Sequence, residues 1–506
     1  MSKGNSMPEP IVLTAHGRQV ELHTADVAEW SAAYDGPLFH AVLTDWPYLL
    51  EFLNSRADRP HLDRYKGEDA FRRDVDAACK LVGWPTWAGA AVLWYRDMAR
   101  ALTPLLHPGA LHFGFGGART FGLLKAGLLG AGWDVHDTVL GWLYGQGEGK
   151  GQKIDRMIGR RLGKNGGPAV AGDRETRDLH DDDPAARWAG HRTPSLAPGW
   201  EPLLVAHTPR RGMTYAEAAL THGAGMINRR LGAVPLDGEK EAQGRPGHWG
   251  GDNAGCQSAF NASPDGGEYR TWQDVSGRYP RNVILDEAAA ALLDAGGPTP
   301  RSGGYPRRRV DSRKGWSGGW REEDGASFEA HGELPNAGLR YGDGRMPSRF
   351  FYVAKANRRE RDAGLRPDLC YHCWQPVEGK LCPRCSTERR PVRPGRNPHL
   401  AVKPIQFAEI PARILLPPPL DVPRRLLIPC SGSGSEGIAA YLAGGLVDGW
   451  DEIVLVEREA GYVRVAEERL RYWMQFTAYE AAMSLVTKVH RGRQVCQPSL
   501  FEVGNA

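Results

Sequence analysis

Four cysteines stand in two closely spaced pairs. Cys370 and Cys373 form one Cys-x2-Cys pair, and Cys382 and Cys385 form a second pair after a spacer of eight residues. Two such pairs of thiolates suit a tetrahedral Zn²⁺ ion, and four thiolates leave no open position for catalysis. The spacing therefore predicts a structural zinc ribbon in which His372 is not needed as a ligand; a redox dithiol is the alternative.

A loop rich in glycine and serine follows a short apolar run near the other end of the sequence. Residues 426–428 have the pattern of a buried strand, residues 429–437 form the loop, and a helical pattern begins at Ile438. A strand, a glycine loop and a helix make a nucleotide-binding turn, because glycine lets the backbone approach the ligand and the helix presents free N–H groups. A second apolar run ends in Glu457, where an acid can bind ribose hydroxyls; a plain turn is the alternative.

A polar and aromatic tetrad, Asp45-Trp46-Pro47-Tyr48, directly follows the apolar run 39–43. Open α/β sheets bind their ligands at the carboxyl ends of strands, which is where this tetrad stands. An isolated Asp-x-Pro-Tyr sequence is also a common turn, so its meaning depends on the glycine loop far along the chain. We expect the fold to bring the two stretches together.

These stretches resemble the motifs of amino-methylating DNA methyltransferases. Residues 428–435 are similar to the Asp-Pro-Phe-x-Gly-Ser-Gly-Thr loop of that family, and residues 45–48 to its (Asp/Asn/Ser)-Pro-Pro-(Tyr/Phe) motif. Residues 397–404 resemble its His-Pro-Thr-x-Lys-Pro turn, and residues 142–150 a stretch of phage and prophage members. The tetrad precedes the glycine loop, which is the β-type order of the family.

The resemblance implies an α/β fold: a Rossmann-like S-adenosylmethionine-dependent methyltransferase sheet with a loop-rich recognition insertion and a small zinc ribbon. It also implies S-adenosylmethionine as cofactor and double-stranded DNA as partner, beside the structural Zn²⁺. The cofactor-binding residues that it implies are Lys403, Pro429, Cys430, Gly432, Ser433, Gly434, Ser435 and Glu457.

The resemblance assigns catalysis to the tetrad. Asp45 and the backbone carbonyl of Trp46 would accept the two hydrogens of an exocyclic amine, Pro47 would continue the turn, and Tyr48 would stack on a base flipped out of the duplex. Aspartate at position 45 favours adenine N6 as the methylated atom, with cytosine N4 as the alternative. A DNA-binding protein derived from a methyltransferase is a further alternative, because Ile428 replaces the family's aspartate. An RNA substrate and a nucleotide-dependent dehydrogenase are weaker readings.

The length of 506 residues predicts several domains. We divide the chain into a first catalytic half (1–155), a target-recognition region (156–345), a strand with the zinc ribbon (346–395) and a second catalytic half (396–506). Residues 301–396 carry 21 lysines and arginines against 12 acids, although the whole chain has a net charge of only +4. This basic segment, which includes aromatic residues near 305–309 and 313–316, suits contacts with a polyanion.

No apolar run is long enough to cross a membrane, and the N-terminal residues lack the apolar core of a signal peptide. Together with metal-spaced cysteines, this predicts a cytoplasmic protein of a prokaryote or a phage-infected cell. A stand-alone methyltransferase of the phage-encoded kind is favoured over one fused to a restriction nuclease. The oligomeric state does not follow from the sequence.

Alternating and continuous apolar runs predict the elements that position these motifs. Strands are expected near 11–14, 20–22 and 39–43, within 106–120, and near 133–145, 200–206, 349–356, 426–428 and 453–456, whereas residues 279–286 lead into a helix. Helices are expected near 94–105, 121–129, 287–293 and 405–415, and after residues 438 and 459.

Overall fold

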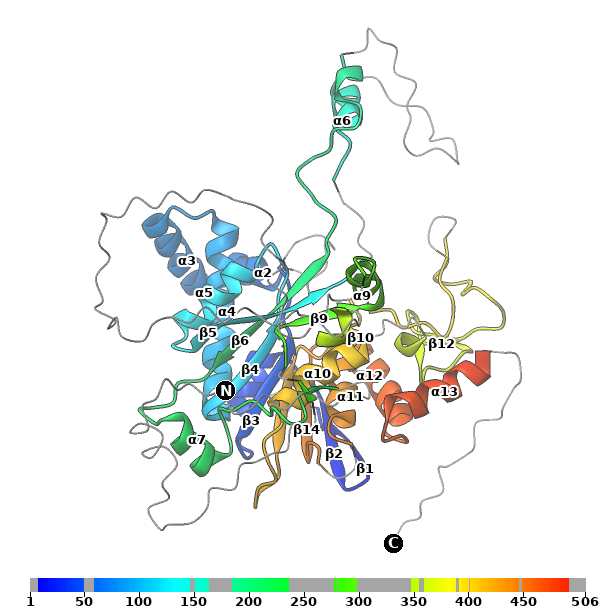
Figure 1. The fold of residues 1–506 in the computed structure, drawn as a ribbon. Helices are drawn as coiled ribbons and strands as arrows, with labels where there is room; N and C mark the ends of the chain where they lie inside the picture. The colour runs from blue at the N-terminus through cyan, green and yellow to red at the C-terminus, as the bar shows by residue number, and fades with distance from the viewer. Residues whose placement is uncertain are drawn as a thin grey trace, which may run out of the picture.

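One large mixed sheet forms the centre of the computed structural model (Figure 1). The described residues are 8–49, 59–145, 151–162, 184–235, 277–278, 280–297, 347–354, 359–387, 391–399, 401–445 and 448–490. The ten strands of the sheet lie in the order β1-β2-β14-β13-β3-β4-β6-β5-β9-β10. Their bounds are β1 Ile11–Ala15, β2 Arg18–Thr24, β3 Phe39–Asp45, β4 Leu106–Phe115, β5 Asp134–Leu143, β6 Trp200–His207, β9 Val283–Asp286, β10 Tyr352–Ala354, β13 Arg425–Pro429 and β14 Glu452–Glu457.

The middle of this sheet is parallel. Strands β2, β14, β13, β3 and β4 all pair in parallel, whereas β6 runs antiparallel to both of its neighbours, β4 and β5. Parallel strands are buried on both faces and therefore need continuous apolar sequences, which β13 and β14 have. The predicted Rossmann-like α/β sheet is confirmed.

Helices cover both faces of the sheet, as Figure 1 shows with α2–α5 on one side and α10–α12 on the other. The helices are α1 Val27–Ala33, α2 Pro60–Gly67, α3 Asp69–Val82, α4 Thr86–Leu102, α5 Phe121–Gly130, α6 Ile154–Arg161, α7 Tyr215–His222, α9 Glu287–Asp294, α10 Ile405–Leu415, α11 Ser435–Leu442, α12 Ala460–Trp473 and α13 Tyr479–His490. Short 3₁₀ turns occupy Thr103–Leu105, Ala186–Trp188, Pro347–Phe350 and Glu360–Asp362.

Successive residues of the central strands face opposite cores. Leu426 and Ile428 of β13 belong to the core beneath α10, α11 and α12, whereas Leu427 belongs to the core beneath α1, α4 and α5. Ile428 is fully buried. The sheet is thus the middle layer of three.

The order in which the chain adds successive strands reverses between β13 and β3, although all these strands run in the same direction. From β13 the chain passes through α11 to β14 on one side, and from β3 it passes through α2–α4 to β4 on the other side. The carboxyl ends of β13 and β3 therefore flank a topological switch point, where open α/β sheets have a crevice for ligands.

The expected elements are present, with two differences of extent. The helix expected at 94–105 begins earlier, at Thr86, because the small residues at 88–91 are buried and continue its apolar face. Strands β6 and β9 of the large sheet fall within 156–345, so the range predicted as a recognition region also contributes strands. The domain boundaries themselves stay a prediction.

Two small features lie outside the main layers. The strands β11 (Leu369–Cys370) and β12 (Gln375–Pro376) form a short hairpin in the cysteine-rich segment, and β7 (Val234–Pro235) pairs with β8 (Gly277–Arg278). Helix α6 lies away from the sheet, beyond β5 and β6 (Figure 1). No helix among the described residues is long and apolar enough to span a membrane.

Candidate active site

The tetrad and the glycine loop lie side by side at the switch point. Strand β3 pairs with β13 through Ala41 and Leu426, and the Thr44 hydroxyl donates a hydrogen bond of 2.7 Å to the carbonyl oxygen of Pro429. Asp45 and Cys430 therefore follow neighbouring strands at the same edge of the sheet. The sequence prediction that two distant stretches meet is confirmed by this pairing.

The glycine loop needs its glycines. Gly432 and Gly434 have φ angles of 53° and 79°, a backbone conformation that favours glycine. A Cβ atom on Gly432 would lie 2.8 Å from the His399 ring, and one on Gly434 would lie 2.9 Å from the Ala466 Cβ of α12. Cys430 also has a positive φ, 55°, without being glycine, so its backbone is strained at the start of the loop.

Side chains from three directions hold this loop. The Glu457 carboxylate at the end of β14 accepts hydrogen bonds of 2.9 Å from the backbone N–H groups of Gly432 and Glu459. Arg469 of α12 donates to the Ser433 carbonyl oxygen at 2.5 Å and to the Ser435 hydroxyl at 3.1 Å. Burial raises the pKa of Glu457 and lowers the pKa of Arg469 to about 10.

Asn397 holds the same loop from the segment before α10. Its side-chain amide donates a hydrogen bond of 3.0 Å to the Ser433 hydroxyl, and its own backbone N–H donates to Asp362 at 2.9 Å. The backbone conformation of the loop is therefore fixed before any ligand binds, which reduces the entropy lost on binding.

A small pocket opens beside the loop. Its lining combines the loop, Asp45 of the tetrad, the segment before α10 and the start of α11: Asp45, His399, Ala401, Val402, Lys403, Cys430, Ser431, Gly432, Ser433, Ser435 and Glu436. Most of the predicted cofactor residues are therefore together. Pro429, Gly434 and Glu457 are not in this lining and instead shape the strand end and the loop.

A buried lysine joins the tetrad to the segment before α10. The Lys403 Nζ atom lies 3.0 Å from Asp45 Oδ2, 2.7 Å from Glu201 Oε1 and 2.8 Å from the Tyr48 hydroxyl, and its side chain is 5% exposed. The Tyr48 hydroxyl in turn donates to Glu201. Burial alone would lower the pKa of Lys403, but the two carboxylates outweigh it and raise that pKa, so the lysine stays protonated.

Asp45 has one oxygen occupied and one free. Lys403 holds Oδ2, whereas Oδ1 is buried and has no hydrogen-bond partner among the described residues. Burial raises the pKa of Asp45, and the positive charge of Lys403 opposes this effect. A buried acceptor without a partner is costly, so Oδ1 suits a donor supplied by a ligand.

Trp46 and Pro47 form hydrogen bonds with residues other than those that contact Asp45. The Trp46 indole is buried and donates a hydrogen bond of 2.9 Å to His112 Nε2, and Trp46, Pro47 and Tyr48 are not part of the pocket lining. The Pro47 carbonyl oxygen accepts from the Tyr95 hydroxyl at 2.6 Å. The carbonyl oxygen of Trp46 accepts no hydrogen bond from the described residues, which leaves it available to an incoming donor.

The residues present fit S-adenosylmethionine. In such a site the glycine loop and the Glu457 carboxylate would hold the nucleoside, and the pocket lining adds the acids Asp45 and Glu436. His399 Nδ1 is a second buried polar atom without a partner in the described part of the chain. Burial lowers the pKa of His399 to about 4, so its ring is neutral and adds no positive charge.

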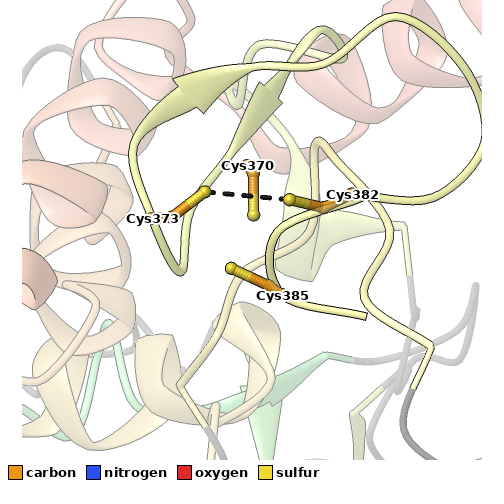
Figure 2. A group of neighbouring side chains, drawn as sticks. All are labelled: Cys370, Cys373, Cys382 and Cys385. Carbon is orange, nitrogen blue, oxygen red and sulfur yellow. Dashed lines mark hydrogen bonds between the residues drawn. The ribbon is translucent and has the colours of Figure 1, made fainter. Parts of the chain in front are cut away.

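The four cysteines point toward one centre (Figure 2). Their sulfur atoms all lie within 4.8 Å of one another, and those of Cys373 and Cys382 are 3.7 Å apart. Zn–S bonds of about 2.3 Å place the sulfurs of a tetrahedral site about 3.8 Å apart, so the cluster has the dimensions of a zinc site. His372 is not part of the cluster.

Sequence reasoning missed two acids of the site. Glu201 lies in β6, far from every motif, and reaches Lys403 only because β6 is inserted beside β4. Glu436 lines the pocket from the first turn of α11, where an acid in an otherwise apolar helix was the available signal. The basic stretches at 305–309 and 313–316, and Lys150, lie outside the described residues.

No protein-family model matches the chain, and no curated protein sequence matches it. Among solved structures, the chain is similar to M1.HpyAVI in complex with SAM, at 12% identity and a TM-score of 0.31, covering 89% of this chain and 100% of that one. It is also similar to the PvuII DNA methyltransferase (cytosine-N4-specific), at 8% identity and a TM-score of 0.36, covering 94% and 93%.

TM-scores of this size carry no argument about activity. What can support a function is the placement of this chain's own residues.

Proposed function

We propose that the protein is a DNA methyltransferase that transfers a methyl group from S-adenosylmethionine to the exocyclic amine of a flipped base, with adenine N6 favoured. The observation that carries this proposal is the meeting of Asp45 with the glycine loop at the switch point, with Lys403 against Asp45. Cofactor and substrate sites must adjoin for direct transfer, and no covalent enzyme intermediate is needed.

The geometry of Asp45 suits an amine substrate. Lys403 fixes one carboxylate oxygen, and the free oxygen can accept one amine hydrogen while the Trp46 carbonyl accepts the other. These two acceptors would draw the nitrogen lone pair out of conjugation with the ring and toward the methyl group that S-adenosylmethionine supplies. Positioning and fixed charges would provide most of the acceleration.

A basic projection supports nucleic acid as the substrate. Helix α6 and the 3₁₀ turn Ala186–Trp188 extend from the β5–β6 side of the sheet (Figure 1). Its exposed arginines are Arg160, Arg161, Arg187 and Arg192. Phosphate contacts of this kind hold a duplex without reading its sequence.

Asp45 rather than serine favours adenine, and cytosine N4 is the second candidate. The reading as a DNA-binding protein without catalysis is favoured by one observation. Ile428 is fully buried in the core, so no acid reaches the pocket from the position where the resembling family has aspartate.

The test is transfer of labelled methyl from S-adenosylmethionine to unmethylated DNA, with the product nucleosides separated. We expect labelled N6-methyladenine from the wild type and a rate about 10²–10⁴-fold lower for Asp45→Ala, since one positioned acceptor is lost. Lys403 keeps Glu201 as partner in this variant, so folding is retained.

The matched control is Asp69→Asn, which changes an exposed acid on α3 and should leave the rate unchanged. Labelled N4-methylcytosine as the product would change the assigned target base from adenine to cytosine and leave the proposed mechanism unchanged. If no label is transferred but DNA binding is intact, the protein is a DNA-binding protein without methyltransferase activity. If label appears in RNA alone, the substrate is RNA rather than DNA.

A further inference from the structure

One buried acid of the pocket is not used by the chemistry described above. Glu436 is the second residue of α11, is 4% exposed and lines the pocket together with Asp45 and Lys403. Its carboxylate forms no ion pair or hydrogen bond with another described side chain. It accepts a hydrogen bond from its own backbone N–H in the first turn of α11, but no cation among the described side chains forms an ion pair with it, so a cationic ligand would supply its counterion.

The charges around Glu436 leave an excess of negative charge. Asp45 and Glu201 share the single charge of Lys403, so Glu436 adds a third carboxylate to the cluster. From α12, Arg469 contributes a second cation outside the pocket lining, and its Nη1 atom donates to the loop oxygens of Ser433 and Ser435. The lining itself contains two acids, Asp45 and Glu436, and one lysine, so it lacks one positive charge when both acids are ionised.

We propose that Glu436 binds the positive charge at the methionine end of S-adenosylmethionine and thereby makes the pocket select a cationic ligand. The inference rests on the proposed function and adds a subsite to it. S-Adenosylmethionine carries a sulfonium, an ammonium and a carboxylate, hence one net positive charge, which equals the missing charge. Glu457, at the end of β14, keeps the ribose role that the resemblance implies, through the lone pairs that its bonds to Gly432 and Glu459 leave open.

Titration of Glu436 supports this assignment. Burial and the nearby charge of Asp45 raise the pKa of Glu436 to about 7, against the opposing charges of Lys403 and Arg469. His399 is neutral, and burial raises the pKa of the Cys430 thiol, so neither of these neighbours adds a charge. A bound cation would lower the pKa of Glu436 again, so binding near neutral pH would expel a proton and strengthen as pH rises.

The decisive measurement is calorimetric titration of S-adenosylmethionine into the full chain, in buffers of different ionisation enthalpy, from pH 6 to 8. For Glu436→Gln we expect a dissociation constant about tenfold weaker than that of the wild type at pH 8, or about 1.4 kcal/mol. At pH 6 the two constants should converge, because the wild-type acid is then mostly protonated. The ligand amine, with a pKa of about 8, titrates equally in both experiments and cancels in the ratio.

Controls separate this inference from the proposed function. Glu409→Gln changes another buried acid, which is paired with Arg413 on α10 outside the pocket lining, and should keep the wild-type pH dependence and proton release. Titration of S-adenosylhomocysteine, which lacks the sulfonium, shows which ligand charge Glu436 binds. If proton release is retained, Glu436 binds the ammonium. If proton release is lost, Glu436 binds the sulfonium. Equal pH dependence in wild type and Glu436→Gln would overturn the inference alone. An absence of S-adenosylmethionine binding to the wild type would overturn the proposed function as well.

Discussion

At the scale of single residues, Lys403 supplies the positive charge that allows two carboxylates to lie close together in the site. Its ammonium contacts the carboxylates of Asp45 and Glu201, whose side chains are 16% and 14% exposed, and lies 5.0 Å and 5.1 Å from the ring centres of Tyr48 and Phe115. Rings attract a nearby cation through their negative faces. The lysine therefore neutralises the tetrad as well as orienting Asp45.

Replacing this lysine should destabilise the whole chain. Lys403→Met leaves Asp45 and Glu201 buried without a counterion, and breaking such a pair costs about 3–5 kcal/mol. The free energy of unfolding in urea at pH 7.5 should fall by that amount. The double variant with Glu201→Gln should recover part of the loss because one unpaired charge is removed.

Lys125→Met, which changes an exposed lysine on α5, serves as the control and should alter the unfolding free energy by less than about 0.5 kcal/mol. A single Lys403→Met variant as stable as the wild type would show that the two carboxylates are neutral or solvated in the folded protein.

The spacing of residues in the sequence predicts some residues of this site but not others. The glycine loop and the tetrad were predictable because each lies at the end of an apolar strand. Glu201 was not, since its approach to Tyr48 spans 153 positions of sequence and depends on where β6 enters the sheet. A sequence pattern within one window contains no information about such a contact.

At the scale of elements, the cysteine-rich segment is attached to the helix that holds the cofactor loop. The Tyr371 hydroxyl donates to Glu468 of α12, and the Arg464 guanidinium lies 3.8 Å from the centre of the Trp374 ring. The next residue of α12 after Glu468 is Arg469, which bonds the loop at Ser433. The cysteine cluster and the glycine loop are thus both in contact with α12.

Removing the metal should therefore weaken cofactor binding. We expect about one Zn²⁺ per chain by elemental analysis, and loss of this metal in Cys373→Ser or after chelation. The dissociation constant for S-adenosylmethionine should rise about tenfold, because Tyr371 and Trp374 would no longer brace α12. Zinc ribbons of this kind fold only with their metal.

Cys79→Ser is the matched control, since Cys79 lies on α3 outside the cluster, and its metal content and affinity should be unchanged. Unaltered S-adenosylmethionine affinity in a metal-free chain would assign the ribbon a role unconnected to the pocket.

Elements with a continuous apolar run or a clear 3.6-residue period were predictable, as β13, β14 and α10 illustrate. Helices α2 and α3 were not predicted. The sequence of α2 is mostly charged and gives little signal, whereas α3 has an amphipathic pattern, with Phe71 and Val75 buried four positions apart, that would have indicated a helix. Phe71 and Val75 belong to the same core as the buried residues of α4.

At the scale of the whole molecule, the centre of the sheet is assembled from opposite ends of the chain. β13 lies between β14 and β3, so neither half contains a complete site. We expect fragments 1–320 and 321–506, produced together, to associate and bind S-adenosylmethionine, since each supplies the strand that the other lacks.

Co-purification and calorimetric titration of the mixed fragments check this expectation, with each fragment alone as control. Binding by the C-terminal fragment alone would show that the tetrad half is dispensable for the cofactor, contrary to the placement of Asp45 and Lys403 in one pocket.

The same arrangement delays completion of the sheet during translation. The bond from Thr44 to Pro429 joins residues 385 positions apart, and translation at about 5–20 residues per second needs roughly 20–80 s to cover that distance. Throughout that interval the nascent chain presents the apolar edge of β3 with no neighbour, and an open strand edge is a template for aggregation. A cell that makes this protein must shield that edge until the last quarter of the chain emerges, so its yield should depend on holdase chaperones more than on the stability of the finished fold.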